Sequence, residues 1–384
     1  MSLTDKEKLQ KQITAAKRIV VKVGTSSLVY ENGKLNFRAF ELLARQLADL
    51  KNSGRQVVLV SSGAVAAGMG KLSLWQKPSE ISKRQALAAI GQGFLMQVYE
   101  KFFAEYGVNV AQVLLTKGDI SQRERYLNAG NTFRALFEYD ILPIVNENDT
   151  TSLSELKVGD NDTLAALTSC LVEADLLVLL SDIDGLYTAD PRQNPTARRI
   201  SLVEEITAEI QNMALGSGGD LGTGGMKTKL IAAEIVNSCG IPMVLANGGT
   251  PEILFSVTEG KDVGTVFAPN HKVLLGKKGW LAYGADSRGK IWIDDGARKA
   301  LVEKGGSLLP SGIRKVEGSF RRGDIVSVYG LNGPTTEIAK GFVNYGSDEI
   351  ERIKGCQSRE IKKILGVDSC EDEVIHRDYM SVKI

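Results

Sequence analysis

The chain has 384 residues, of which 43% are apolar and 24% are charged, and its net charge is +1. This length predicts two domains, each large enough for a core of its own, and the balanced charge gives no global attraction to nucleic acid or membrane. No apolar run approaches the about 20 residues of a transmembrane helix, and the N-terminal segment lacks the apolar stretch of a signal peptide, so we expect a cytoplasmic protein with no membrane partner.

Cysteines and histidines are few, and their scarcity limits the possible chemistry. The four cysteines show no CxxC spacing, which favours free thiols over a metal site. His271 and His376 lie outside any polar cluster. A mechanism that depends on histidine as an acid or base therefore has almost no material here.

Apolar runs that end in small or polar residues begin early in the chain. The first covers residues 18–24 and contains Lys22, and the second covers residues 56–61 and runs into Ser62. A lysine inside such a run is either an edge residue with its amine in solvent or a cation aimed at a phosphate beside a glycine turn. The small residues after the second run would let a ligand approach the backbone closely.

Helices are expected between these strands. Asn36 can cap a helix that reaches about residue 52, and a long helix is expected over residues 85–106. Gly91 and Gly93 lie inside the long helix, where each glycine costs about 1 kcal/mol relative to alanine. We therefore expect these glycines to allow close helix–helix contact, for example between subunits.

Two further polar clusters follow predicted strands. Strands are expected over residues 110–116 and 141–146, and the second is followed by Asn146–Asp149. A polar turn at residues 159–163 opens a helix, and the next strand ends in Ser181 and Asp182. Because the carboxyl ends of parallel strands share one edge of a sheet, clusters after four strands should converge on a ligand site.

A glycine-rich run at residues 216–225 leads directly into Met226–Lys229, the expected first turn of a helix. A flexible linker is the simplest interpretation of such a run, but it explains poorly why the run feeds a helix start that carries Lys227 and Lys229. Free amides, a positive helix dipole and a lysine together suit a polyphosphate. No Walker A sequence and no GxGxxG after a strand occurs, which disfavours the two commonest nucleotide folds.

The alternation of strands and helices up to about residue 268 predicts an α/β domain with one mainly parallel sheet sandwiched by helices. Short expected strands over residues 289–294, 313–320, 325–329 and 337–345 predict a small, mostly β second domain. We place the two domains at residues 1–276 and 277–384.

The available side chains favour phosphoryl transfer. Lysines, carboxylates and glycine turns collect at strand ends, without a histidine or cysteine nucleophile. Phosphoryl transfer needs positioning and charge neutralisation more than covalent help. A carboxylate acceptor, with a free pKa of about 4, is already ionised at neutral pH and requires no general base.

Six segments together resemble the glutamate 5-kinases of the amino acid kinase superfamily. They are VVKVGTSS, SSGAVAAG, VNENDT, VGDNDTLAAL, LLSDIDGLYTADPR and GTGGMKTKLIAA, and they follow that family's order and spacing over essentially the whole chain. LYTADPR indicates only the superfamily, whereas VNENDT followed by VGDND is similar to the glutamate enzymes in particular. Residues 288–366 resemble a PUA domain, a small β-barrel.

The resemblance implies an amino acid kinase fold and ATP-dependent phosphorylation of the L-glutamate γ-carboxylate, the first step of proline biosynthesis. Lys22 and Lys229 match the family's catalytic lysines, and Asp162 matches the aspartate that orients them. The matching glutamate-binding positions are Ser62, Asp149, which would suit the α-ammonium, and Asn161, which can bind a carboxylate.

The resemblance also implies a nucleotide site. It comprises Lys22, Ser181, Asp182, Thr223, Gly224, Gly225, Met226, Lys227, Thr228 and Lys229. The family commonly has threonine where this chain has Ser181, and the hydroxyl is kept. ATP would bring Mg²⁺, held mainly by phosphate oxygens and water rather than by a dedicated protein site.

Partners implied by the resemblance are L-glutamate, proline as a feedback inhibitor, and further copies of the chain in a dimer or tetramer. Residues 288–322 hold nine Lys and Arg against four Asp and Glu, which allows a basic face, although RNA is not an expected partner. Two alternatives stay open at this point: another phosphotransferase of the superfamily, and an RNA-binding protein that acts through the PUA-like domain.

Overall fold

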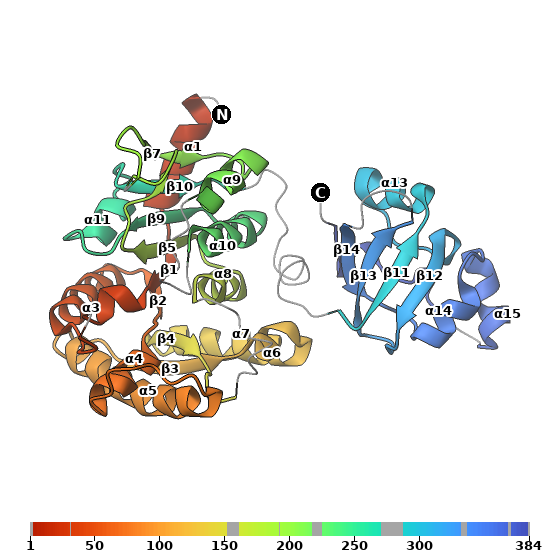
Figure 1. Cartoon of the computed structure of the whole chain (residues 1–384). Helices are drawn as coiled ribbons and strands as arrows, with labels where there is room; N and C mark the ends of the chain where they lie inside the picture. Colours follow the sequence, from red (N-terminus) through yellow and green to blue (C-terminus); the bar gives the residue numbers. More distant parts are fainter. Residues whose placement is uncertain are drawn as a thin grey trace. The chain divides into compact units, whose positions relative to one another are not determined.

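The computed structural model describes residues 3–30, 32–151, 161–191, 193–216, 225–269, 287–331, 336–367 and 370–382. The chain divides into two compact units, the first formed by Met1–Ile120 and Glu124–Val273 and the second mainly by Leu274–Ile384 (Figure 1). The predicted domain boundary at residues 276 and 277 falls outside the described residues. Of the helices that are described, none is long and apolar enough to cross a membrane.

The first unit alternates strands and helices along the chain. Its helices are α1 (Leu3–Thr14), α2 (Thr25–Leu28), α3 (Phe37–Asn52), α4 (Ala64–Lys71), α5 (Ile81–Ala104), α6 (Lys117–Ser121), α7 (Arg123–Glu138), α8 (Asn161–Leu171), α9 (Ala208–Gly216), α10 (Met226–Ser238) and α11 (Ile253–Thr258). Its strands are β1 (Arg18–Val23), β2 (Gln56–Val60), β3 (Val110–Leu115), β4 (Leu142–Glu147), β5 (Leu176–Ser181), β6 (Leu186–Tyr187), β7 (Arg199–Ile200), β8 (Leu202–Val203), β9 (Met243–Asn247) and β10 (Gly264–Phe267).

One eight-stranded sheet, in the order β3-β4-β2-β1-β5-β9-β10-β8, organises this unit. The strands from β3 to β9 in that order are all parallel, whereas β10 runs antiparallel to β9. Helices cover both faces (Figure 1). The predicted α/β domain with a mainly parallel sheet between helices is confirmed, and β1 lies in the middle of its parallel part.

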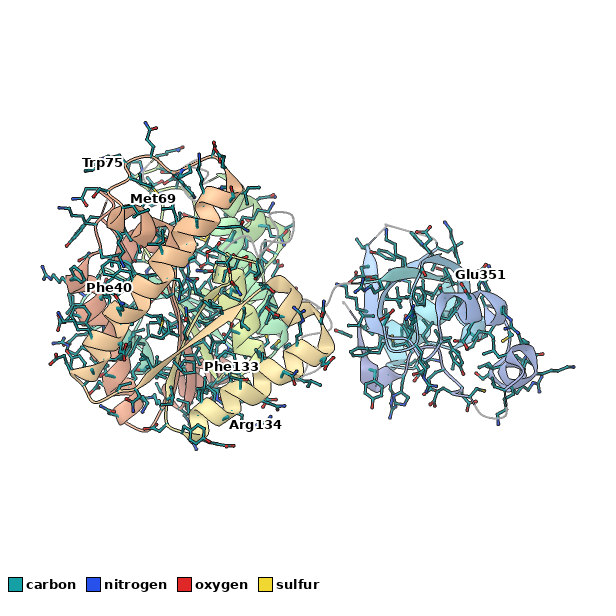
Figure 2. The ribbon with its side chains drawn as sticks, turned by 90° about the horizontal axis from the view of Figure 1, so that it is seen from below. Phe40, Met69, Trp75, Phe133, Arg134 and Glu351 are labelled. Carbon is teal, nitrogen blue, oxygen red and sulfur yellow. The ribbon has the colours of Figure 1, made fainter. Side chains whose placement is uncertain are left out.

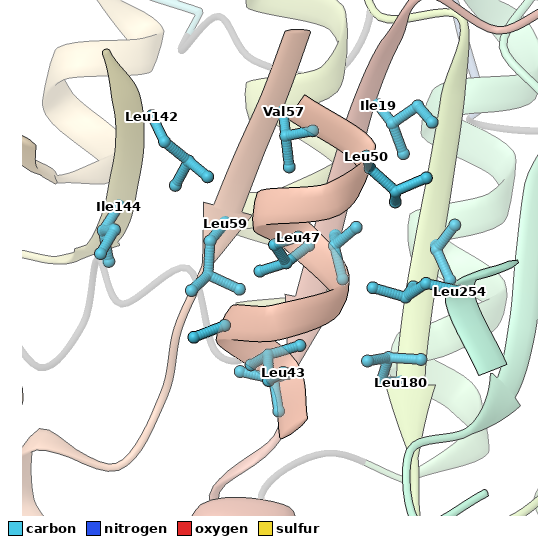
Figure 3. Packing of buried hydrophobic residues seen from close by; sticks show 14 of the residues in the cluster. Ile19, Leu43, Leu47, Leu50, Val57, Leu59, Leu142, Ile144, Leu180 and Leu254 are labelled. Carbon is cyan, nitrogen blue, oxygen red and sulfur yellow. The ribbon is translucent and has the colours of Figure 1, made fainter. Parts of the chain in front are cut away.

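The two faces of β1 have different surroundings, because successive residues of a strand point to opposite sides. Ile19 and Val21 belong to the core formed with α3, where Leu47 and Leu50 pack toward the sheet (Figure 3). Lys22 is on the opposite side, which α8 and α10 cover (Figure 1). The lysine that looked out of place in an apolar run therefore faces a helix start and not solvent.

Aromatic side chains fill both helical layers. Phe40 of α3 packs against Tyr99 of α5 with ring centroids 4.9 Å apart, and Phe133 of α7 is almost completely buried. Both phenylalanines lie inside the first unit in Figure 2, whereas Trp75, in the loop between α4 and α5, lies at its surface and is 80% exposed. Trp75 is therefore not part of the core.

Glycines allow α4 and α5 to touch through their backbones. A Cβ atom on Gly91 would stand 1.8 Å from the carbonyl oxygen of Ala64, and one on Gly68 would stand 2.1 Å from that of Leu87. Gly93 has open space at the same position. The close helix–helix contact expected of Gly91 is thus present within the chain.

The second unit is a five-stranded sheet in the order β12-β11-β13-β14-β15, with α13, α14 and α15 beside it. The bounds are β11 (Gly289–Ile293), α13 (Asp295–Lys304), β12 (Ile313–Gly318), β13 (Ile325–Gly330), β14 (Glu337–Phe342), α14 (Ser347–Ile353), α15 (Ile361–Leu365) and β15 (Met380–Val382). Among the described strands of this unit, β11 and β13 pair in parallel and the other neighbours are antiparallel. The predicted mostly β second domain is confirmed, although α14 and α15 were not foreseen.

Candidate active site

The predicted polar clusters meet at one edge of the sheet. The parallel strands β1, β2, β4, β5 and β9 all end there, since they point the same way. The residues that follow them include Gly24, Ser62, Asn148, Asp182 and Gly248. This edge is where an open α/β sheet binds ligands.

At the centre of this edge, one carboxylate holds two lysines. Asp162 Oδ1 lies 2.5 Å from Lys22 Nζ, and Asp162 Oδ2 lies 3.1 Å from Lys229 Nζ. Asp162 is fully buried, and each lysine is only 6% exposed. We call these three residues the charge triad. Two ammonium groups face one carboxylate, so one positive charge is left over within the triad.

The ionisation of Asp162 is secured by its partners. Burial alone would raise the pKa of this carboxyl group, because it disfavours the charged form. The ammonium groups of Lys22 and Lys229 outweigh burial, by charge and by hydrogen bonding, and lower the pKa of Asp162 below its ordinary value. Asp162 is therefore a carboxylate at neutral pH and the counter-ion of both ammonium groups.

Each member of the charge triad comes from a different element. Lys22 is paired with Leu179 of β5 and with Val60 of β2, so its backbone is fixed from both sides. Asp162 lies in the first turn of α8, and Lys229 lies in the first turns of α10, which packs along α8. The three residues of the charge triad are therefore far apart in the sequence, and the parallel sheet with its helices brings them into contact.

The start of α10 is suited to an anion. Its cap residue Gly225 has no side chain to bond the free amides of the first turn. Thr228 Oγ1 lies 2.8 Å from Gly225 O and 3.2 Å from Asp162 Oδ2, which ties this turn to the charge triad. Met226 is partly buried, and Lys227 is exposed. The predicted nucleotide residues Thr223 and Gly224 lie outside the described residues.

The other two predicted nucleotide residues are Ser181, the last residue of β5, and Asp182, which follows this neighbour of β1. Ser181 Oγ donates to Asp182 Oδ1 at 2.9 Å, and Ser181 O accepts from Gly248 N at 2.9 Å. Among the residues that the structure describes, no hydrogen bond joins Ser181 or Asp182 to the charge triad. They lie on the same sheet edge but in a separate group from Lys22 and Lys229.

Two of the three predicted acceptor residues touch each other. Asn161 Nδ2 lies 2.7 Å from Ser62 Oγ, 2.8 Å from Ser61 O and 3.0 Å from Asn146 Oδ1. An amide nitrogen has two hydrogens, so three acceptors compete for them. A carboxylate that arrives here can take one of these hydrogens without leaving Asn161 unpaired.

The third predicted acceptor residue, Asp149, lies in the loop after β4. It lines a cavity of about 270 Å³ between this loop and the start of α4 and the middle of α5. It also lines a smaller cavity of about 50 Å³ with Lys77 and Arg84. Asp149 is thus apart from the Asn161–Ser62 pair, at a place where the far end of an acceptor could sit.

Sequence reasoning assigned no role to two residues that the structure places here. Asn146 bonds Asn161, and Gln92 of α5 bonds Asn146 through its side chain at 2.8 Å. Asn146 belongs to the polar cluster at residues 146–149 that the sequence indicated, and it lies near the end of β4. Gln92 lies in the middle of a long helix, and no local pattern marks it.

The part of the chain that the structure describes contains no group of three or more His, Cys, Asp or Glu side chains that could hold a metal ion. All four cysteines are free, with Cys170 buried.

Two family models match the chain. The model of the amino acid kinase family matches residues 17–247, and the model of the PUA domain matches residues 289–365. The first match contains the whole charge triad and covers more than half of the chain. The second coincides with the strands β11 to β14 and the helices between and after them.

Full-length relatives share about half of the sequence. A protein named glutamate 5-kinase from Thermoanaerobacter sp. (strain X514) is 52% identical over 365 residues, which cover 95% of this chain and 97% of the relative. Proteins of the same name from Carboxydothermus hydrogenoformans and Geobacter sulfurreducens are 53% and 49% identical, over 94% and 96% of this chain and 96% and 98% of their own lengths. These names favour the first of the functions that the sequence left open over both alternatives.

Proposed function

Because this chain belongs to the amino acid kinase family and, within it, to the glutamate 5-kinases, we propose that it transfers the γ-phosphoryl group of ATP to the γ-carboxylate of L-glutamate. The observation that carries the proposal is the charge triad, a buried group with one positive charge to spare at the ligand-binding edge of the sheet. A transferring phosphoryl group supplies the negative charge that this group lacks.

The reaction needs no base from the protein. One oxygen of the γ-carboxylate forms a bond to the γ-phosphorus, while the bond from that phosphorus to the oxygen it shares with the β-phosphate breaks and ADP leaves. The attacking carboxylate is ionised at neutral pH. The absence of histidine from the site described here therefore fits the proposed reaction.

Lys22 and Lys229 stabilise the charge that spreads over the transferring group. Preorganised charges in a water-poor site act strongly, because they need no rearrangement during the reaction. Asp162 holds both ammonium groups 2.5 and 3.1 Å from its oxygens, so they are positioned before substrate arrives. In this role Asp162 positions the lysines and takes no proton.

ATP is proposed to lie along the end of β5 and the start of α10, with Ser181, Asp182 and residues 223–229 as its binding residues. The acceptor is proposed to place its γ-carboxylate at Asn161 and Ser62 and its ammonium at Asp149. Support comes from the geometry of the two groups: the first flanks the charge triad on the side of β5, and the second on the side of β2 and β4. The charge triad then lies between donor and acceptor, as in-line transfer requires.

Mg²⁺ is proposed to accompany ATP and to shield its phosphates. Asp162 does not fit as a ligand, because two ammonium groups occupy its oxygens. The ion would instead be held by phosphate oxygens and water, in keeping with the habits of Mg²⁺ at phosphate sites. Inhibition by proline, assembly into a dimer or tetramer and a cytoplasmic location are further proposals, which rest on family membership alone.

A coupled assay for ADP release tests the proposed function. L-glutamate, L-aspartate, N-acetyl-L-glutamate and UMP are offered separately, with ATP and Mg²⁺ present. We expect turnover with L-glutamate, and much weaker or no turnover with the other three. Turnover with UMP alone would overturn the proposal.

A further inference from the structure

Three carboxamides form a chain from the proposed acceptor group to the larger cavity. Asn161 Nδ2 lies 3.0 Å from Asn146 Oδ1, and Asn146 Nδ2 lies 2.8 Å from Gln92 Oε1. Gln92 is a residue of α5 and lines the cavity that Asp149 also lines. Gln92 is not among the residues proposed to contact ATP or the γ-carboxylate.

Which atom of each carboxamide is the oxygen and which the nitrogen follows from neighbours that can only donate or only accept a hydrogen bond. The backbone N–H of Glu147 can only donate, and it lies 2.9 Å from the Asn146 side chain, so the atom that receives it is the oxygen. The nitrogen of Asn146 then faces Gln92 and donates to it. Gln92 must therefore present its oxygen to Asn146, which turns its NH₂ group away from that contact.

The same reasoning fixes the far end of the chain. The carbonyl oxygen of Ser61 can only accept, and it lies 2.8 Å from the Asn161 side chain, so that atom is the nitrogen. All three amides thus have one arrangement that satisfies their neighbours. Among the described residues, Gln92 Nε2 has no hydrogen-bond partner. Of the three carboxamides, Gln92 is therefore the one whose NH₂ group remains to donate to a ligand.

The cavity needs such a donor if it receives an amino acid. Its described lining contains the carboxylates Glu147 and Asp149, the amides Gln92, Gln112 and Asn148, and no lysine or arginine. An ammonium group can pair with the two carboxylates, whereas a substrate carboxylate meets no cation in this described lining, because Lys77 and Arg84 line the smaller cavity instead. A fixed NH₂ group is then the partner that can satisfy it.

We propose that Gln92 Nε2 donates a hydrogen bond to the α-carboxylate of the acceptor, and that the backbone amide of Glu147, acting through Asn146, sets its direction. This proposal rests on the proposed function, because it takes L-glutamate as the acceptor. Gln92 thereby selects an acceptor with a free α-carboxylate, while Asn161 and the charge triad act at the other end of the molecule.

The variant Gln92→Glu tests this selection. The new carboxylate still accepts from Asn146 and has nearly the same shape, but it cannot donate to the substrate. We expect the KM for L-glutamate to rise by about 10- to 100-fold, with kcat within about threefold, since an unpaired and repelled carboxylate weakens binding at a distance from the reacting atoms.

A substrate analogue makes the test specific. L-Isoglutamine keeps the γ-carboxylate but carries a carboxamide in place of the α-carboxylate, so it can donate where L-glutamate cannot. Wild-type protein should prefer L-glutamate, and Gln92→Glu should reduce the ratio of kcat/KM for the two compounds by about 100-fold or more. A purely structural role for Gln92 would lower both values together and leave the ratio unchanged.

Two further variants guard the interpretation. Gln97→Glu adds the same charge to an exposed position of the same helix, and it should leave both KM values within about twofold of wild type. Gln92→Met removes the donor without adding charge, and it should weaken the preference without reversing it. An unchanged ratio in a folded Gln92 variant would overturn the inference, whereas a wild-type protein that ignores L-glutamate would overturn the proposed function itself.

Discussion

The first unit of this chain buries one group of charged side chains, whereas the ion pairs described in the second unit lie at its surface. In the first unit, Lys22, Asp162 and Lys229 are withdrawn from water and held against one another. In the second unit, the pair Arg314–Asp294 has side chains 46% and 31% exposed, and Lys315–Glu317 has side chains 62% and 38% exposed. Exposed pairs contribute about 0 to 1 kcal/mol, whereas buried charges are costly unless they are well paired.

This difference supports the charge triad as the place of the proposed chemistry. A fold keeps a buried excess of charge only where something outweighs its cost, and a ligand of opposite charge is the simplest candidate. The basic residues counted between positions 288 and 322 include several that already face an acidic neighbour at the surface. Counting charges along the sequence does not reveal this contrast, whereas burial does.

Replacing Asp162 should produce the largest change in stability. Asp162→Asn leaves two buried ammonium groups without their counter-ion, so the free energy of unfolding should fall by about 3–5 kcal/mol in urea titrations at neutral pH. The pKa of Asp162 in the folded chain lies below its ordinary value of 3.8. Its stabilisation is therefore complete above that value and is lost as the pH falls toward the folded pKa, so the gap between wild type and variant should narrow in acid. A gap that persists unchanged at the lowest accessible pH would refute this explanation.

Replacing Lys229 should lower the catalytic rate and leave the fold intact. Lys229→Ala removes one of the two charges proposed to face the phosphoryl group, and kcat should fall by about 10²- to 10³-fold, while Asp162 keeps Lys22 as its partner. Lys299→Ala in the second unit is the matched control, since Lys299 is 66% exposed and pairs weakly with Glu303 at 4.0 Å. If the steady-state rates of the two variants differ by less than tenfold, the buried lysine is no more important for activity than the exposed one, which would contradict this prediction.

Disturbing the backbone contact between α4 and α5 should have an intermediate effect on the free energy of unfolding. Gly91→Ala would place a methyl group 1.8 Å from Ala64 O, so α4 and α5 would have to separate, at a cost of about 1–3 kcal/mol in unfolding free energy. Gly93→Ala, two residues along the same helix, meets nothing within 4 Å and should be neutral or stabilising by up to about 1 kcal/mol. Equal effects of the two substitutions in thermal unfolding would show that the helices are not in backbone contact.

The smallest effect is expected in the second unit. Asp294 caps α13 by accepting from Ala297 N at 2.8 Å and also pairs with Arg314. Asp294→Ala should cost about 1 kcal/mol through loss of the cap, whereas Asp294→Asn keeps the cap and should stay within about 0.5 kcal/mol of wild type. A large fall in the free energy of unfolding of Asp294→Asn would mean that the exposed Asp294–Arg314 pair stabilises the fold more than exposed pairs usually do.

Much of the fold is readable from local pattern, because each parallel strand is a continuous apolar run with a polar or small residue after it. That rule located the strands that carry Lys22 and Ser181, and the parallel order then implied that their ends converge. The reversed direction of β10 has no such signal, since a four-residue strand looks alike in either sense.

The site was predictable to the same extent as the strand ends that build it. Helix starts gave Asn161 and Lys229, and a strand end gave Asp149. The bond between Gln92 and Asn146 was not predictable, because it depends on how α5 packs relative to β4, and only the tertiary structure determines that. The assigned roles of these residues stay predictions until variants are measured.

Trapping the product with hydroxylamine tests most directly whether this sheet edge phosphorylates a carboxylate. An acyl phosphate reacts with hydroxylamine to give a hydroxamate and phosphate, so wild-type protein with ATP and L-glutamate should form one glutamyl hydroxamate for each ADP, and Lys229→Ala should lose both products together. Release of ADP with no hydroxamate would mean that the phosphoryl group goes to water or to another acceptor, and it would contradict the proposed function.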